Sequence, residues 1–177
     1  EDKRIDQRSG VSQRLPISLL ENVVSSAERR ALLQDEGTVV PRLSDLYAAL
    51  PSITGKMELE YEGELHGAEK IARELISSAA GQTYGQRAGG ADVQEIVEYF
   101  EGGGALQVSE DASAEACIQA FTVVPSLLGL VERLGLAPSS GLPGVRAAAC
   151  ELVLEALVAE RRISRIDGRY ARPPFEV

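Results

Sequence analysis

The chain has 177 residues, of which 44% are hydrophobic, so it is long enough to bury a core in one domain or in two small ones. Aromatic residues make up only 5%, and the apolar residues are mostly Leu, Ala, Ile and Val, which favours packed helices over a sandwich or a barrel. The formal charge of −9 argues against broad binding to nucleic acids or to anionic membranes, because both would repel an acidic surface.

The first predicted element is a long helix, because apolar residues recur at helical spacing from Leu19 to Leu32. Ser18 and Glu21 fit a capping box just before that run. Pro16 suits the first turn of the helix or the position before it. The helix is expected to end within residues 34–37.

Two further helices are predicted in the first half of the chain. The second runs through residues 43–50, and Pro51 is expected to end it. The third covers residues 68–80, and Gly81 is expected to end it. Residues 56–65 fit either a strand, by their alternation, or a helix, by their composition, so both remain open.

Residues 82–91 are rich in glycine and lack periodicity, which predicts a linker. It divides the chain into an N-terminal domain, residues 1–81, and a second domain, residues 92–177. The elements predicted in the second domain are a helix over 92–101, a strand over 106–108, a helix capped by Ser113, a helix over 126–134 and a helix over 145–160. The glycines from Gly102 to Gly104 are interpreted as a loop, since a phosphate-binding loop would open a helix with Lys, Ser or Thr.

The end of the chain carries a strong hairpin signal. Asp167 and Gly168 form a two-residue turn between residues 162–166 and 169–171. A helix followed by a short hairpin is how a winged-helix unit ends. The predicted fold class is therefore mostly α, with a small helical, winged-helix-like second domain, and Ile163, Ile166 and Tyr170 are expected to pack on the last helix.

A Gly-x-Ser-x-Arg pattern, formed by Gly10, Ser12 and Arg14, stands just before the first predicted helix. After that helix come a Val-x-Pro connector, residues 39–41, and then Asp45 followed by Leu46. In this order the elements resemble the helical lid of AAA+ ATPases, in the branch that contains MoxR-type proteins and subunit I of magnesium chelatase. The resemblance runs from Gly10 to about residue 46 and implies that residues 1–81 are an AAA+ lid with its extension.

The resemblance implies that Arg14 is the sensor-2 arginine, which reaches from the lid to the γ-phosphate of ATP. Ser12 is the second nucleotide-site candidate, although a cap on the first helix is the simpler role for it. The phosphate loop G-x-x-x-x-G-K-[ST] is missing, because Gly55 and Lys56 are followed by Met57. ATP and Mg²⁺ are therefore expected in a longer parent protein, and this chain alone is expected to be non-catalytic, with no cofactor and no metal.

The charged start at residues 1–4 lacks a signal-peptide core and indicates a piece cut from a longer protein. By resemblance, the parent would couple ATP hydrolysis to partner remodelling or to insertion of a metal or cofactor. Its partners would be the AAA+ core of the same protein, neighbouring subunits of a ring, expected to be a hexamer, and a protein with a von Willebrand A-like domain. No membrane partner is expected, because the sequence lacks a long uninterrupted apolar run.

Two alternative functions come from other residues. The terminal arginines, at positions 161, 162, 165, 169 and 172, would let a winged-helix adaptor bind nucleic acid or protein. Against nucleic acid, residues 92–177 hold 13 acidic and 7 basic side chains, a net charge of −6. Glutamates at 58, 60, 62 and 64 would share one face of a strand and bind a divalent metal, although a solvated surface or a docking surface fits their spacing better.

The remaining chemically reactive residues are interpreted as structural. Cys117 and Cys150 lie in apolar helical patterns without ligand-spaced neighbours, which indicates buried thiols in a reducing, cytoplasmic compartment. His66 is the single histidine and is interpreted as a surface residue, since no sequence pattern supplies a nucleophile and an acid for it.

Overall fold

The computed structural model describes residue 5 and residues 12–59, 61–138 and 141–173. Within these residues the chain is mostly helical, with a small three-stranded antiparallel sheet, so the predicted mostly-α class is confirmed. Gly10 of the Gly-x-Ser-x-Arg pattern and Glu60 of the glutamate run lie outside the described residues.

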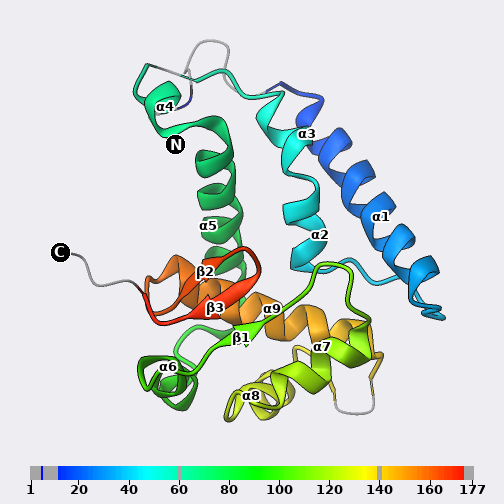
Figure 1. Ribbon diagram of the computed structural model, residues 1–177, viewed down its shortest axis with the longest axis vertical. Coiled ribbons are helices and arrows are strands. Elements are labelled where there is room, and N and C mark those ends of the chain that lie inside the picture. Colours follow the sequence, from blue (N-terminus) through cyan, green and yellow to red (C-terminus); the bar gives the residue numbers. More distant parts are fainter. Residues whose placement is uncertain (1–4, 6–11, 60, 139–140, 174–177) are drawn as a thin grey trace.

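Helices are the regular elements among the described residues of the first half, and Leu59 forms one isolated antiparallel bridge with Ile5. The helices are α1 (Leu15–Leu33), α2 (Leu43–Ala48), α3 (Leu50–Thr54), α4 (Tyr61–His66) and α5 (Ala68–Ala88). Helices α2 and α3 lie between α1 and α5 and contact both (Figure 1). Their apolar faces enclose a first hydrophobic core, in which Leu50, Ile53 and Ile71 are buried.

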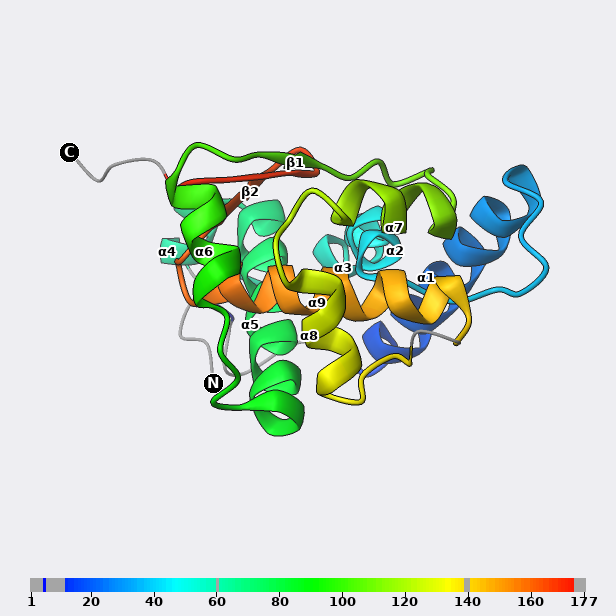
Figure 2. The same ribbon diagram turned by 90° about the horizontal axis from the view of Figure 1, so that it is seen from below.

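The second half surrounds one apolar helix. Its elements are α6 (Gln94–Glu101), β1 (Leu106–Gln107), α7 (Ala114–Phe121), α8 (Leu127–Arg133), α9 (Pro143–Ala159), β2 (Ser164–Ile166) and β3 (Arg169–Ala171). Helix α9 runs across the molecule and contacts α5, α7 and α8 (Figure 2). Because α9 is covered from several sides, it is apolar around most of its circumference and buries nine of its residues.

The sheet has the strand order β1-β3-β2, with all neighbours antiparallel. Asp167 and Gly168 both have positive φ, 48° and 74°, as the predicted two-residue hairpin turn requires. Tyr170 is buried, but Ile166 is 65% exposed, so the expectation that Ile166 packs on the last helix is wrong. Side chains alternate along a strand, and Arg165, paired with Tyr170, takes the inward position instead.

Helix α5 is longer than predicted and belongs to two cores. Ile71 and Ile76 are buried in the first core, whereas Tyr84 and Ala88 are buried in the second. The predicted helix end at Gly81 is therefore wrong, and the predicted linker over residues 82–91 is helical through Ala88. Close packing explains this, because a Cβ added at Gly81 would lie 3.0 Å from the Cβ of Ala159 on α9. The glycine here serves helix contact and not a helix end.

Local chemistry sets the other helix boundaries. Helix α1 begins at Leu15 with Pro16 in its first turn, as predicted, so Ser18 lies inside the helix and the predicted capping box is wrong. Pro51 does not simply end the second helix, because a new helix, α3, begins beside it and proline fits a first turn. Ser113 caps α7 as predicted, and its Oγ accepts a hydrogen bond from the amide of Ala116 at 3.1 Å.

Candidate functional site

Arg14 stands directly before α1, on the surface of the protein. Its carbonyl accepts from the amide of Ser18 at 3.0 Å, and its own amide donates to Oγ of Ser12 at 3.3 Å. The amide of Ser12 in turn donates to the carbonyl of Lys56 at 3.1 Å. The backbone that carries Arg14 is therefore fixed at both ends, and Ser12 closes the turn that leads into α1.

The guanidinium of Arg14 makes no hydrogen bond or ion pair with the residues that the structure describes. Two exposed apolar side chains follow it at spacings of three residues along α1, namely Ile17, 61% exposed, and Leu20, 64% exposed. Among the described residues, a cation without a partner thus precedes two exposed apolar side chains. We call Arg14, Ile17 and Leu20 the Arg14 strip.

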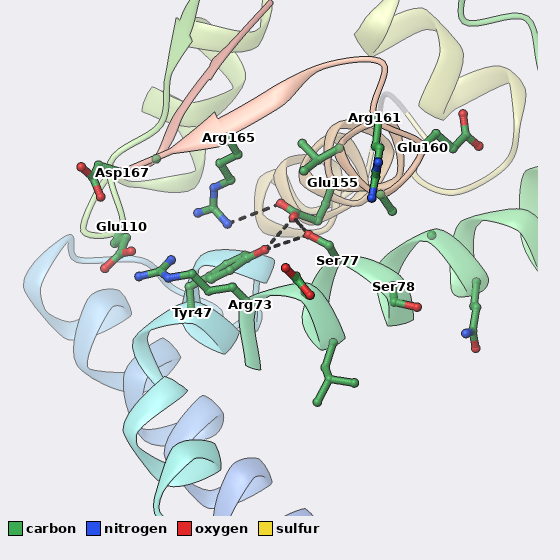
Figure 3. A pocket seen from close by; sticks show the side chains of 17 residues that line it. Tyr47, Arg73, Ser77, Ser78, Glu110, Glu155, Glu160, Arg161, Arg165 and Asp167 are labelled. Carbon is green, nitrogen blue, oxygen red and sulfur yellow. Dashed lines mark hydrogen bonds and ion pairs between the residues drawn. The ribbon is translucent and has the colours of Figure 1, made fainter. Parts of the chain in front are cut away.

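A cavity of about 970 Å³ lies between α5, the end of α9 and the β2–β3 hairpin (Figure 3). Its inner wall holds Tyr47, Ser77, Glu155 and Arg165, which point toward one another in Figure 3. Charged side chains surround them, among them Arg73, Glu74, Glu110, Glu160, Arg161 and Asp167.

Glu155 is the centre of the inner wall. Its Oε1 accepts from the hydroxyl of Tyr47 at 2.6 Å and from the hydroxyl of Ser77, and its Oε2 lies 3.4 Å from Nη1 of Arg165. The guanidinium of Arg165 also covers the Tyr47 ring, with 3.8 Å between Cζ and the ring centroid. Both carboxylate oxygens of Glu155 are therefore engaged by protein groups, which suits a structural junction better than a general base.

Protonation states in this wall follow from burial and neighbouring charges. Burial, followed by the negative charge of Glu155, raises the pKa of Tyr47 to about 12. Burial alone would lower the pKa of Arg165, but electrostatic interactions with Tyr170 and Glu155 raise it above its ordinary value. Tyr47 stays a neutral donor and Arg165 stays a cation.

A second buried network lies one turn earlier on α9. Oε2 of Glu151 accepts from the amide of Ser44 at 3.0 Å, and its Oε1 lies 3.6 Å from Nε of Arg42. The same arginine donates from Nη1 to Sγ of Cys117 at 2.8 Å and from Nη2 to the carbonyl of Ala112 at 2.9 Å. The side chain of Arg42 is 0% exposed. Its contacts therefore connect the start of α2 to α7 and α9.

Burial raises the pKa of Glu151, while the positive charge of Arg42 and the Ser44 amide oppose that change. Burial likewise raises the pKa of Cys117, with Arg42 opposing it, and raises the pKa of Cys150 to about 12. Both cysteines are free and buried, as their apolar patterns predicted. Neither thiol has the lowered pKa of a reactive cysteine.

The structure separates the other candidate residues. Residues 61–66 form helix α4, so Glu64 does not lie in one strand with Glu58, and His66 is exposed. Within the described ranges no group of three His, Cys, Asp or Glu side chains is placed to hold a metal ion. Arg165 is buried against Glu155, so it is not part of the predicted basic surface, whereas Arg169 and Arg172 are exposed.

The sequence reasoning missed Arg42, Glu151 and Glu155, and it singled out Asp45 without giving it a role. A signal was present, because Glu151 and Glu155 stand four residues apart in a helix that is otherwise almost wholly apolar from residue 145 to 159. Carboxylates placed there face the same side and must be paired when buried.

Comparison of the chain with protein-family models, with curated proteins and with solved structures gives no match. Among the described helices, none is both long enough and apolar enough to cross a membrane.

Proposed function

We propose that this chain is the C-terminal lid region of an AAA+ ATPase of the MoxR or magnesium-chelatase type, and that Arg14 is its sensor-2 arginine. The observation that carries the proposal is the position of Arg14, an exposed guanidinium on a fixed backbone turn, unpaired within the described residues. The Gly-x-Ser-x-Arg resemblance adds the direction in which it acts, toward the γ-phosphate of ATP held by a core elsewhere in the parent protein.

The chemistry of arginine suits this role. A guanidinium is planar and always charged, so it forms paired hydrogen bonds to phosphate oxygens and offsets the charge that develops during phosphoryl transfer. Because Arg14 is attached to α1, loss of the γ-phosphate would release the lid and change its orientation. ATP hydrolysis would thereby be coupled to a change in the orientation of the lid.

The apolar members of the Arg14 strip support the same proposal. Ile17 and Leu20 stay mostly exposed in this chain, and they follow Arg14 at spacings of three residues at the start of α1. An ATP-binding core that brought its phosphates to Arg14 would cover both side chains. Burying them would stabilise that interface by about 25 cal/mol for each Å² of apolar surface removed from water.

In this proposal residues 1–81 are the lid, and residues 92–177 are a winged-helix-like accessory part. The parent protein would bind ATP and Mg²⁺ through its core, form a ring, expected to be hexameric, in the cytoplasm, and act on a protein with a von Willebrand A-like domain. Its output would be partner remodelling or metal or cofactor insertion. This chain alone would not hydrolyse ATP.

The test is steady-state ATP hydrolysis by the longer parent protein. Arg14→Ala is expected to lower kcat about tenfold or more, equivalent to about 1.4 kcal/mol on the barrier, with the fold intact by circular dichroism. Arg14→Lys, which keeps the charge but loses the paired geometry, is expected to recover only part of the rate. Arg87→Ala, on the exposed end of α5, is the matched control and should leave the rate unchanged.

An unchanged rate in Arg14→Ala would remove the arginine from the mechanism. A folded parent without ATPase activity would favour the rival function, a winged-helix adaptor that binds nucleic acid or protein. That adaptor would depend on the exposed Arg169 and Arg172, and if its partner were nucleic acid the binding would weaken steeply with salt.

A further inference from the structure

Helix α9 carries two buried carboxylates that face the first half of the chain. The side chains of Glu151 and Glu155 are 2% and 1% exposed. Glu151 accepts from the amide of Ser44, in the first turn of α2, and Glu155 accepts from the hydroxyl of Tyr47, near the end of α2. Both ends of α2 are thus hydrogen-bonded to α9 through the carboxylates of Glu151 and Glu155.

Glu155 joins two more elements at the same point. Ser77 of α5 donates to the oxygen that Tyr47 also uses, and Arg165 of β2 pairs with the other oxygen. Arg165 in turn stacks on Tyr47, so the hairpin contacts α2 directly as well as through the carboxylate. A displacement of α2 therefore disturbs the hairpin at two contacts.

These contacts lie between the two hydrophobic cores. Tyr47 is buried in the first core, and Tyr170, the strand partner of Arg165, is buried in the second. Partial separation at this boundary would keep the Glu155–Arg165 ion pair but would remove the Tyr47 and Ser77 hydroxyl donors from the buried Glu155 carboxylate and the Tyr47 ring from Arg165, and a buried acceptor that loses its donors costs free energy. We therefore expect these contacts to oppose a gradual displacement of α2 relative to α9 and the hairpin.

From this arrangement we infer that Glu151 and Glu155 form a conformational coupling device, through which α2 and the β2–β3 hairpin move as one rigid body with α9. Motion that begins in the N-terminal helices reaches the hairpin without being absorbed at residues 82–91. The inference stands independently of any ATPase function, because it concerns the packing of this chain alone.

Amide hydrogen exchange on this chain, resolved by residue, tests the device. In the wild type, amides of α2 and of the hairpin are expected to share one opening transition as low concentrations of urea are added. Glu155→Gln is expected to speed exchange in both α2 and β2–β3 by about tenfold or more, because it leaves Arg165 buried without a charged partner. Amides of α8, which does not touch Glu155, should change much less.

Two further variants complete the test. Arg29→Ala removes an exposed ion pair with Asp111 that also links the two halves, and it should leave exchange in α2 and the hairpin unchanged. Tyr47→Phe keeps the ring and removes only the hydroxyl donor, so it still measures the coupling if Glu155→Gln fails to fold. Tyr47→Phe should speed amide exchange in α2 and in the hairpin together. Loosening of α2 alone, or an effect no larger than that of Arg29→Ala, would overturn the inference.

Discussion

Nη2 of Arg30 donates to Oδ2 of Asp45 at 3.0 Å, and both side chains are only 2% exposed. Asp45 also accepts from the hydroxyl of Ser26 at 3.0 Å and from the amide of Arg42 at 2.7 Å. Nη1 of Arg30 pairs with Glu36 at 2.8 Å, and Glu36 accepts from the amide of Ala114 at the start of α7. One buried arginine therefore sets the positions of α1, α2 and α7.

This pair predicts a large loss of stability on truncation. Asp45→Ala is expected to lower the free energy of unfolding by about 3 kcal/mol, because Arg30 keeps its charge and Glu36 becomes its single carboxylate partner. Urea denaturation followed by circular dichroism measures the change. Asp111→Ala, which removes an exposed pair with Arg29, is the control and should cost less than about 1 kcal/mol. Equal losses in the two variants would contradict the assigned role of Asp45.

The raised pKa of Tyr47 predicts sensitivity to alkali. Its hydroxyl keeps its proton up to a pKa of about 12 in the folded state and up to about 10 in the unfolded chain. The unfolded state therefore loses the proton first, so stability is fully present below about pH 10 and falls between about pH 10 and pH 12, by about 1.4 kcal/mol per pH unit. Urea unfolding at several alkaline pH values measures the slope.

Tyr47→Phe should make that alkaline slope shallower, although Cys150, with a pKa of about 12, and Tyr170, whose pKa burial raises well above its ordinary value, still contribute. Tyr61→Phe is the control, since Tyr61 is 74% exposed, and should leave the slope as it is. A slope unchanged in Tyr47→Phe would show that the hydroxyl titrates normally.

The hairpin turn predicts a glycine requirement at one position. Gly168 has a φ of +74°, and a Cβ there would lie 2.6 Å from the carbonyl oxygen of Val108. Gly103 has a similar φ of +93°, but a Cβ there would meet nothing within 4 Å. Gly103→Ala should therefore cost about 1 kcal/mol for backbone strain alone, and Gly168→Ala should cost clearly more. Thermal unfolding compares them, and equal shifts would mean that the backbone at Val108 moves aside freely.

The two thiols are expected to be unreactive toward thiol reagents in the folded protein. Cys117 and Cys150 are 2% and 0% exposed, and burial raises the pKa of each. Modification by a thiol reagent at pH 8 should be at least about a hundredfold slower than in urea, because it waits for the chain to open. Rapid labelling of either cysteine without urea would indicate local opening around α7 or α9.

Elements with local chemical signals were predictable from the sequence. The cap at Ser113 and the turn at Asp167 and Gly168 each depend on the residues beside them, so their patterns led to the right structures. The long apolar helix α9 was found for the same reason. The residues that follow one another within α9, and not its contacts elsewhere in the fold, decide that this segment is helical.

Features that depend on distant residues were not predictable. The glycines of α5 indicated an end at Gly81, but contact with Ala159 on α9 made a small residue necessary inside the helix. The partners of Glu155 come from positions 47, 77 and 165, and no local pattern brings them together. For Arg14 the sequence supplied a position and a proposed role, and the structure adds its exposure and its fixed backbone.

Helix α5 places its first turns in one core and its last turns in the other, with residues 76 and 84 on either side of the change. Exchange of sequence between two related chains at a crossover in α5 would therefore be expected to disturb the packing of the product. A junction inside α5 would join helix faces shaped for different partners, and one placed after Ala88 would separate Tyr84 from the core that it fills. A cut within α5 or just after it would therefore take buried side chains away from one of the two cores.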